Sequence, residues 1–224
     1  MIIIDSRMRN EEKEYLKQFG ELIEIKPQNS VYEEISAHPD IFFCKIEDKI
    51  FRATNIDINI GTIGTSDVST KYPNDIRYNI CQIGKCVIHN FKYTDSTVLD
   101  YINTKNLNKI QVNQGYSKCS ICPTSENSCI TSDEGIYKAL KNKGIDALLI
   151  QERINLLNKQ GQITQMNGFI GGGAAVIGNT FILFGDIEKI KEKGKLLEHL
   201  KKYNLELKHF QEQEIIDYGG IIET

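Results

Sequence analysis

Hydrophobic and polar positions repeat in one order along this chain. An apolar strand is followed by an acidic residue, an amphipathic helix, a Gly or Asn, and a second apolar strand. The four occurrences begin at "MIIID", "KCVIHNFKYTD", "SCITSD" and "NTFILFGD". Before the last three stands another apolar segment, joined by a short turn. The pattern predicts a repeated unit of strand, strand, helix, strand.

The residues at the unit boundaries support this interpretation. Four aspartates lie where a carboxylate can accept hydrogen bonds from the free backbone amides of a first helical turn. Thr131 and Glu134 have the spacing of a capping box. These aspartates are Asp5, Asp95, Asp133 and Asp186. The predicted helices end at Gly20, Gly144 and Asn204, which tolerate a left-handed backbone. Apolar residues at 196, 197 and 200 mark the buried stripe of the last helix, so we expect helices lying on sheets.

Two further segments complete a count of five units. The hairpin in "HPDIFFCKIEDKIFRA" leads into a long polar segment without a clear helix, which indicates a degenerate second unit. The tail "DYGGIIET" is a lone strand, whereas the first unit lacks its leading strand. The five units then start near Met1, Ile35, Asp75, Gly115 and Gly168. We expect residues 1–5 to pair with residues 220–223, which would close a ring of units and protect sheet edges.

Composition narrows the class of protein. The 224 residues are 40% hydrophobic and 25% charged, which is typical of a globular protein. A chain of this length forms one domain or two small ones, and with the repeated strands and helices we expect a single α/β domain over residues 1–224. The net charge of −3 offers no general attraction to nucleic acid. No apolar run approaches the length of a membrane span, and the start lacks the pattern of a signal peptide. We therefore expect a cytoplasmic protein whose six cysteines are reduced thiols or ligands.

The segment "NQGYSKCSICPTSENSC" holds three cysteines within eleven positions. Cys119 and Cys122 have the spacing of a zinc knuckle, but no second pair of that spacing accompanies them, so we expect no metal. A redox pair would start a helix, whereas this segment is expected to run into a turn and a strand. "GFIGGGAAVIG" is followed by a strand rather than a phosphate-binding helix, so we expect no dinucleotide or other cofactor. A catalytic thiolate and plain burial in a sheet remain as alternatives for Cys119.

Five such units in a closed ring resemble the pentein fold, also called the guanidine-modifying enzyme fold. The blocks "HPD", "QGYSKCS", "TSDEGI" and "GFIGGG" resemble an uncharacterised bacterial family assigned to that fold. The fold includes arginine and agmatine deiminases, dimethylarginine dimethylaminohydrolases and amidinotransferases, and also a noncatalytic ribosome-binding translation factor. The resemblance implies a five-unit propeller ring closed by its terminal strands, with a small-molecule ligand in a central channel.

The resemblance also implies site residues. Deiminases of this fold carry a nucleophilic cysteine in C-x-x-x-P, matched by residues 119–123, and an H-x-D motif, matched by residues 38–40. Cys119 would attack a guanidinium carbon, His38 would move protons, and Asp40 would hold the cation. The usual E-G-G-D block is incomplete, because "DYGGI" offers Asp217 but no acid after its glycines. The residues predicted to bind substrate are Asp217, Lys118, Gly171 and Gly172.

The resemblance leaves two functions open. The first is a cysteine-dependent hydrolase or transferase acting on a guanidine-like or amide-like small molecule. The second is a noncatalytic module that binds a protein or ribosomal surface. An ionised Cys119 facing a channel beside His38 favours the enzyme, whereas a buried thiol favours the module. A hydrogen-bonded histidine at a strand edge is the structural alternative for His38, and the oligomeric state is left undetermined.

Overall fold

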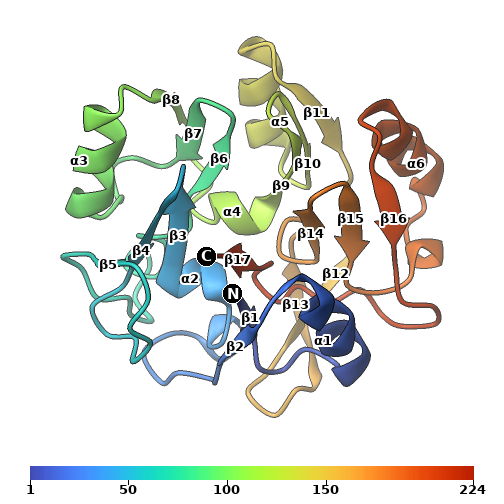
Figure 1. The fold of residues 1–224 in the computed structure, drawn as a ribbon, viewed down its shortest axis with the longest axis horizontal. Helices are drawn as coiled ribbons and strands as arrows, with labels where there is room; N and C mark the ends of the chain where they lie inside the picture. The colour runs from blue at the N-terminus through green and yellow to red at the C-terminus, as the bar shows by residue number, and fades with distance from the viewer.

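The computed structural model describes residues 1–224. Five three-stranded sheets and one two-stranded sheet make up its β structure, and Figure 1 shows them arranged around the middle of the molecule. In the order of their strands, the three-stranded sheets are β17 (Ile222–Glu223), β1 (Ile2–Asp5) and β2 (Leu22–Ile25); β3 (Phe43–Ile46), β4 (Lys49–Arg52) and β5 (Thr62–Ile63); β6 (Cys81–Ile83), β7 (Cys86–His89) and β8 (Asn108–Gln111); β9 (Ile121–Ser125), β10 (Ser128–Thr131) and β11 (Asp146–Leu149); β14 (Ala174–Ile177), β15 (Thr180–Leu183) and β16 (Glu206–Lys208).

The five three-stranded sheets share one topology. In each, the middle strand pairs antiparallel with one neighbour and parallel with the other. A parallel pair needs a crossover, and in four sheets a helix provides it. These helices are α1 (Asn10–Leu16), α3 (Ser96–Thr104), α5 (Glu134–Asn142) and α6 (Lys193–Lys202). The predicted order of strand, strand, helix, strand is confirmed, as is the second unit without a helix between β4 and β5.

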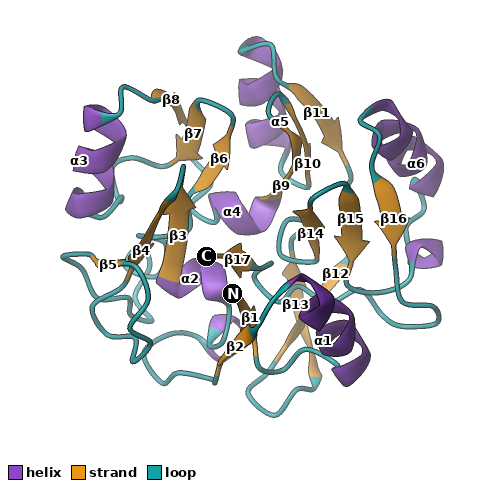
Figure 2. Cartoon of the chain, viewed as in Figure 1, coloured by secondary structure: helices purple, strands orange, loops and turns teal.

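The two ends of the chain meet in one sheet. Strand β17 runs antiparallel to β1, with Ile2 opposite Glu223 and Ile3 opposite Ile222, so the predicted terminal pairing is confirmed. The sheets otherwise remain separate, and none closes on itself. Figure 2 shows the four crossover helices at the periphery and two short helices nearer the middle. None of the helices has the length and apolar character needed to cross a membrane.

Helix capping follows the sequence at three of the four predicted aspartates. Asp133 accepts from the Ile136 amide at 2.7 Å at the start of α5, and Asp95 accepts from the Thr97 amide at 2.9 Å at the start of α3. Asp186 caps the 3₁₀ helix η3 (Ile187–Lys189) that precedes α6. Asp5 is not a cap, because its carboxylate pairs with Arg7 two residues later.

Other local expectations were also wrong. Thr131 does not form a capping box with Glu134, because the helix begins two residues later than that spacing assumed and Asp133 is its N-cap. Leu197 is 45% exposed, so the buried stripe of α6 consists of Leu196, His199 and Leu200.

Three elements were not predicted from the pattern of the chain. Two are the short helices α2 (Pro39–Phe42) and α4 (Ser117–Ser120), each of which leads directly into the first strand of a sheet. The third is the two-stranded sheet of β12 (Ile154–Leu157) and β13 (Ile163–Gly168), which lies between the fourth and fifth units. The two short helices carry the candidate catalytic residues, so they determine where the site forms.

Candidate active site

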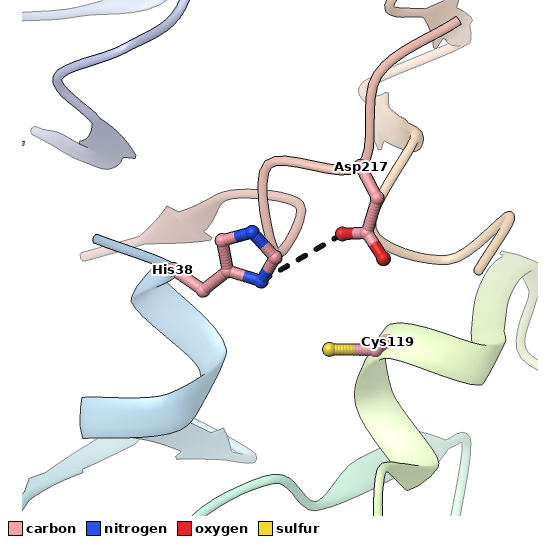
Figure 3. Close-up of side chains that lie close together, drawn as sticks. All are labelled: His38, Cys119 and Asp217. Atoms are coloured by element: carbon pink, nitrogen blue, oxygen red, sulfur yellow. Dashed lines mark ion pairs between the residues drawn. The ribbon is translucent and has the colours of Figure 1, made fainter. Parts of the chain in front are cut away.

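Three segments that lie far apart in the sequence deliver the candidate side chains. His38 is the N-cap of α2, where Pro39 takes the first helical position that suits its fixed backbone angle. Cys119 lies in α4, and Asp217 lies in the segment that leads to β17. Figure 3 shows the three side chains pointing toward one another.

The functional atoms of these residues converge. One ring nitrogen of His38, the sulfur of Cys119 and a carboxylate oxygen of Asp217 all lie within 4.8 Å of one another. His38 Nδ1 is 3.8 Å from Asp217 Oδ1, which is longer than a hydrogen bond. The thiol of Cys119 donates to Asp40 Oδ2 at 2.8 Å. The structure therefore brings together four of the residues singled out in the sequence.

Asn79 fixes the position of Cys119, and sequence reasoning missed it. Its amide oxygen accepts from the backbone amides of Lys118 at 2.8 Å and Cys119 at 3.2 Å, and its amide nitrogen donates to the Cys119 sulfur at 3.2 Å. The same nitrogen donates to the Asp40 carbonyl at 3.3 Å. One buried side chain thus ties α4 to α2. A lone Asn before an apolar strand carries no signal of this role in a single sequence.

Glycines let the backbone pack against the acidic side chains. A Cβ on Gly172 would overlap the Asp217 carboxylate, and a Cβ on Gly219, whose φ is +71°, would lie 2.5 Å from the Cβ of His38. A Cβ on Gly171 would lie 2.5 Å from the backbone of Ile121. Gly172 thus packs against Asp217 and Gly171 against Ile121, and neither lines the cavity described next. The prediction that Gly171 and Gly172 bind substrate stays a prediction.

A cavity of about 480 Å³ opens above Cys119 and Asp217, which both line it. Its other polar lining residues are Glu34 and Asn167, and the rest of its wall is aromatic or aliphatic. The rings of Tyr116 and Phe169 stack in this wall, with centroids 6.3 Å apart and planes at 30°. The size and mixed lining suit a small-molecule ligand with a polar reacting group and an apolar body.

Burial keeps Cys119 and His38 neutral. Burial is the largest cause that raises the pKa of the Cys119 thiol well above its usual range, and the charges of Asp40 and Asp217 raise it further. Burial also lowers the pKa of the His38 imidazole well below its usual range, and the nearby Arg7 charge adds to this effect. Neither ring nitrogen of His38 has a hydrogen-bond partner. In the ligand-free protein the pair is therefore a thiol and a neutral imidazole, rather than a thiolate and an imidazolium.

The two carboxyl groups at the site titrate near neutral pH. Burial raises the pKa of Asp40 to about 6, although Lys118 and the bond from Cys119 oppose the shift. Burial and the charge of Asp40 raise the pKa of Asp217 to about 7. Asp217 still accepts from the Phe169 and Gly219 amides, each at 2.8 Å. Two buried acids that repel each other form a site that would be stabilised by a cation.

Lys118 lies on the other side of α4 from Cys119. It lines a second cavity of about 430 Å³, together with Cys81 and Cys122. Burial lowers the pKa of its amine, but Cys81, Asp40 and other acidic neighbours outweigh this effect and raise it overall. Lys118 thus does not line the cavity above Cys119.

The structure corrects two local interpretations at the site. Cys119 lies on a helical turn, not in a sheet, because the backbone amides of Lys118 and Cys119 donate to the Asn79 side chain and hold the turn in place. His38 is a buried N-cap without a hydrogen-bond partner, not a hydrogen-bonded histidine at a strand edge. Cys122 is on β9 in a core cluster with Ile130 and Phe181, apart from the site residues.

The donor set of His38, Cys119 and Asp217 could also hold a metal ion. An imidazole nitrogen, a thiolate and a carboxylate are ligands that zinc accepts, and three protein ligands leave a fourth position open. Binding would require loss of the thiol proton that Cys119 shares with Asp40. The ligands differ from the Cys119 and Cys122 knuckle considered from the sequence. The expectation that the protein binds no metal stays a prediction.

Comparison with solved structures identifies the class of fold. A dimethylarginine dimethylaminohydrolase in an adduct with S-methyl-L-thiocitrulline matches with a TM-score of 0.51 at 7% identity, covering 93% of this chain and 91% of its own. An amidinotransferase of Microseira wollei from the saxitoxin biosynthetic pathway matches at 0.50 and 11%, covering 96% and 88%. An agmatine deiminase of C. jejuni matches at 0.50 and 11%, covering 92% and 73%.

These structural neighbours are pentein-fold enzymes that modify guanidine groups. At such low identity the likeness shows the fold, which is a mixed α/β fold with small sheets. Residues 3–222 match a family of unknown function, DUF6873, and the chain belongs to that family. No curated protein matches the sequence.

Proposed function

We propose that this protein is a cysteine-dependent hydrolase or transferase that acts on a guanidine-like or amide-like small molecule. The observation that carries the proposal is the convergence of His38, Cys119 and Asp217 within 4.8 Å, where Cys119 and Asp217 line a cavity of about 480 Å³ and His38 is buried beside them. The five three-stranded sheets would be the five units of a pentein-type propeller in a single domain. Guanidine chemistry in the structural neighbours supports this assignment.

The electrostatics of the site favour a positively charged substrate. In the ligand-free site the carboxylates of Asp40 and Asp217 raise the pKa of the Cys119 thiol. A planar cation that donates hydrogen bonds to these carboxylates would neutralise their charge. The thiol pKa would then fall, so the nucleophile would form only when substrate is present.

The chemical steps follow from the positions of the three groups. The Cys119 proton passes to the neutral His38 ring, and the thiolate forms a C–S bond to the central carbon of the amidine. The imidazolium then protonates the leaving nitrogen, and the C–N bond breaks to release an amine. In hydrolysis His38 takes a proton from a water that attacks the thiouronium carbon, and the C–S bond breaks to restore the thiol. In group transfer an amine replaces this water.

A second candidate function is a noncatalytic binding module. The observation in its favour is that Cys119 is only 2% exposed and that its thiol pKa is raised well above the usual range. In this case the two acids and the cavity would bind a cationic group of a ligand or partner without reaction. The thiol would then pack against Asp40 as a neutral donor.

Alkylation by two reagents of similar shape separates these functions. 2-Chloroacetamidine is a cation, and 2-chloroacetamide is its neutral counterpart. The measured quantity is the rate of labelling by chloroacetamidine divided by the rate of labelling by chloroacetamide. If Cys119 is an activated nucleophile in a cation site, this ratio should be at least about tenfold higher for Cys119 than for a free thiol. Mass-spectrometric mapping at pH 7.5, with a chelator present, identifies the modified cysteine.

Substitutions sharpen the same experiment. Asp40→Asn should abolish the preference for the cation and should speed labelling by chloroacetamide, because one charge that raises the thiol pKa is removed. Cys122→Ala is the matched control and should leave labelling of Cys119 unchanged. Cys119 that stays unmodified while other cysteines react would contradict the enzyme and leave the binding module.

A further inference from the structure

The cavity above Cys119 has no positive charge in its lining. Neither a lysine nor an arginine nor a histidine is among its lining residues, whereas Glu34 and Asp217 both are. Glu34 forms no ion pair, and its side chain makes no hydrogen bond within the protein. A ligand with a carboxylate at its far end would meet no cationic side chain there, only the acidic Glu34, the neutral Asn167 and aromatic or apolar side chains.

The two basic residues nearest the site cannot supply the missing charge. The Arg7 guanidinium is held by Asp5 and donates to the carbonyl oxygens of Glu33, Glu34 and Leu157. Its side chain is 5% exposed, so the guanidinium holds these backbone segments together and does not present its charge to the cavity. Lys118 lines the other cavity, on the far side of α4.

An aromatic wall begins where the reacting group would be held. The backbone amide of Phe169 donates to Asp217 at 2.8 Å, while its ring stacks on Tyr116 in the cavity wall. The Tyr116 hydroxyl donates to Asp75 at 2.6 Å, so Tyr116 presents its ring rather than its hydroxyl. A substituent on a cation bound at Asp217 would therefore extend along two aromatic faces. The wall continues to Met166 and Tyr32, which are 55% and 47% exposed at the rim.

We propose that the substrate is a guanidinium or amidinium cation that carries an apolar N-substituent, aromatic or alkyl, and no carboxylate. The inference rests on the proposed function, because it assumes that the cation binds at Cys119 and Asp217. Phe169 and Tyr116 hold the substituent, and Glu34 repels ligands that end in a carboxylate. Free amino acids such as arginine are thereby excluded.

Protection of Cys119 from alkylation tests this substrate class. Phenethylguanidine, L-arginine and the uncharged phenethylurea would each be titrated against labelling by 2-chloroacetamidine. Phenethylguanidine should protect at a concentration at least about tenfold lower than arginine, since the carboxylate of arginine would lack a cationic partner and would meet Glu34. Phenethylurea should protect weakly, because it lacks the charge that the two acids require.

Two variants assign the selectivity to named residues. Glu34→Lys should lower the ratio of the protecting concentration of arginine to that of phenethylguanidine by about tenfold. The substitution places a cation where the carboxylate of arginine would lie. Glu206→Lys makes the same charge change at an exposed position that does not line the cavity, and should leave the preference unchanged. Phe169→Leu should weaken protection by phenethylguanidine several-fold and protection by arginine little.

The outcomes separate the two proposals. If chloroacetamidine shows no preference for Cys119, the proposed function fails and the substrate class falls with it. If Cys119 is labelled selectively, but arginine protects as well as phenethylguanidine or neither compound protects, the substrate class is wrong while the proposed function stands. Cooperative unfolding of each variant confirms that a loss of protection does not reflect a loss of fold.

Discussion

Individual side chains at the site are held in protonation states that their residue types do not suggest. Asp40 and Asp217 keep protons up to about pH 6 and about pH 7, since burial raises the pKa of each. The Cys119 thiol and the His38 imidazole are neutral for the same reason. The site therefore stores electrostatic free energy that a bound cation would release. This electrostatic free energy should be measurable as a pH-dependent change in the free energy of unfolding.

Asp217→Asn should change how stability depends on pH. The folded protein holds a proton on Asp217 up to about pH 7, whereas the unfolded chain loses it near the ordinary value of 3.8. Between these values the folded state binds more protons, so its free energy of unfolding falls as pH rises, by up to about 1.4 kcal/mol per pH unit. The variant lacks this contribution and should gain stability relative to wild type between pH 5 and pH 8.

Urea denaturation at the two pH values measures the effect. The exposed Asp57→Asn makes the same chemical change away from the site and should show no such gain. An equal stability difference between wild type and Asp217→Asn at both pH values would mean that the carboxyl of Asp217 does not titrate in this range.

At the scale of elements, two short helices and two glycine segments assemble the site. Helices α2 and α4 each form one turn before a strand, and Asn79 joins them. Gly172 of "IGGGA" and Gly219 of "DYGGI" let the backbone pack where a side chain would collide with Asp217 or with His38. The backbone amide of Gly172 also donates to the Cys119 carbonyl at 2.9 Å, which links the glycine segment to α4. These two small residues therefore help to position Asp217 and His38.

Gly172→Ala should therefore disturb Asp217 directly. The added methyl group would overlap its carboxylate, so we expect a loss of about 1 to 3 kcal/mol in the free energy of unfolding. The preference of Cys119 for chloroacetamidine over chloroacetamide should also fall. Gly194→Ala is the matched control, because a Cβ there meets open space within α6, and it should raise stability by up to about 1 kcal/mol. Unchanged stability and labelling in Gly172→Ala would show that Asp217 can move aside freely.

At the scale of the whole molecule, the first and last strands share one sheet. Ile222 is 5% exposed and belongs to the same core cluster as Ile3, Phe43 and Phe51. Strand β17 therefore contributes to the core as well as to an edge of β1. Asp217 precedes this strand by a few residues, so terminal pairing also positions one of the site carboxylates.

Ile222→Ala tests how much the terminal strand stabilises the fold. Loss of buried methyl groups should reduce the free energy of unfolding by about 2 to 4 kcal/mol. Glu223→Ala, at the next and exposed position of the same strand, should stay within about 0.5 kcal/mol of wild type. Urea unfolding curves of the two variants provide the comparison. Similar midpoints would show that β17 is dispensable for the core.

The sequence by itself determined the repeated unit, most of its boundaries and the pairing of the terminal strands. Periodicity and caps depend on residues within about four positions of one another, so Asp133 and the left-handed Gly144 could be read locally. The candidate residues His38 and Cys119 came from resemblance, and their convergence required the fold to bring residues 38, 119 and 217 together.

Only the tertiary structure decided the state and surroundings of these groups. The helical turn under Cys119 depends on Asn79, forty positions earlier in the chain, and the neutral thiol and imidazole depend on burial by segments from several sheets. The acidic and aromatic cavity likewise combines Glu34, Tyr116 and Phe169 from separate segments. Desolvation and long-range contacts have no local pattern in a single sequence, because they arise from packing between residues that are not neighbours in the chain.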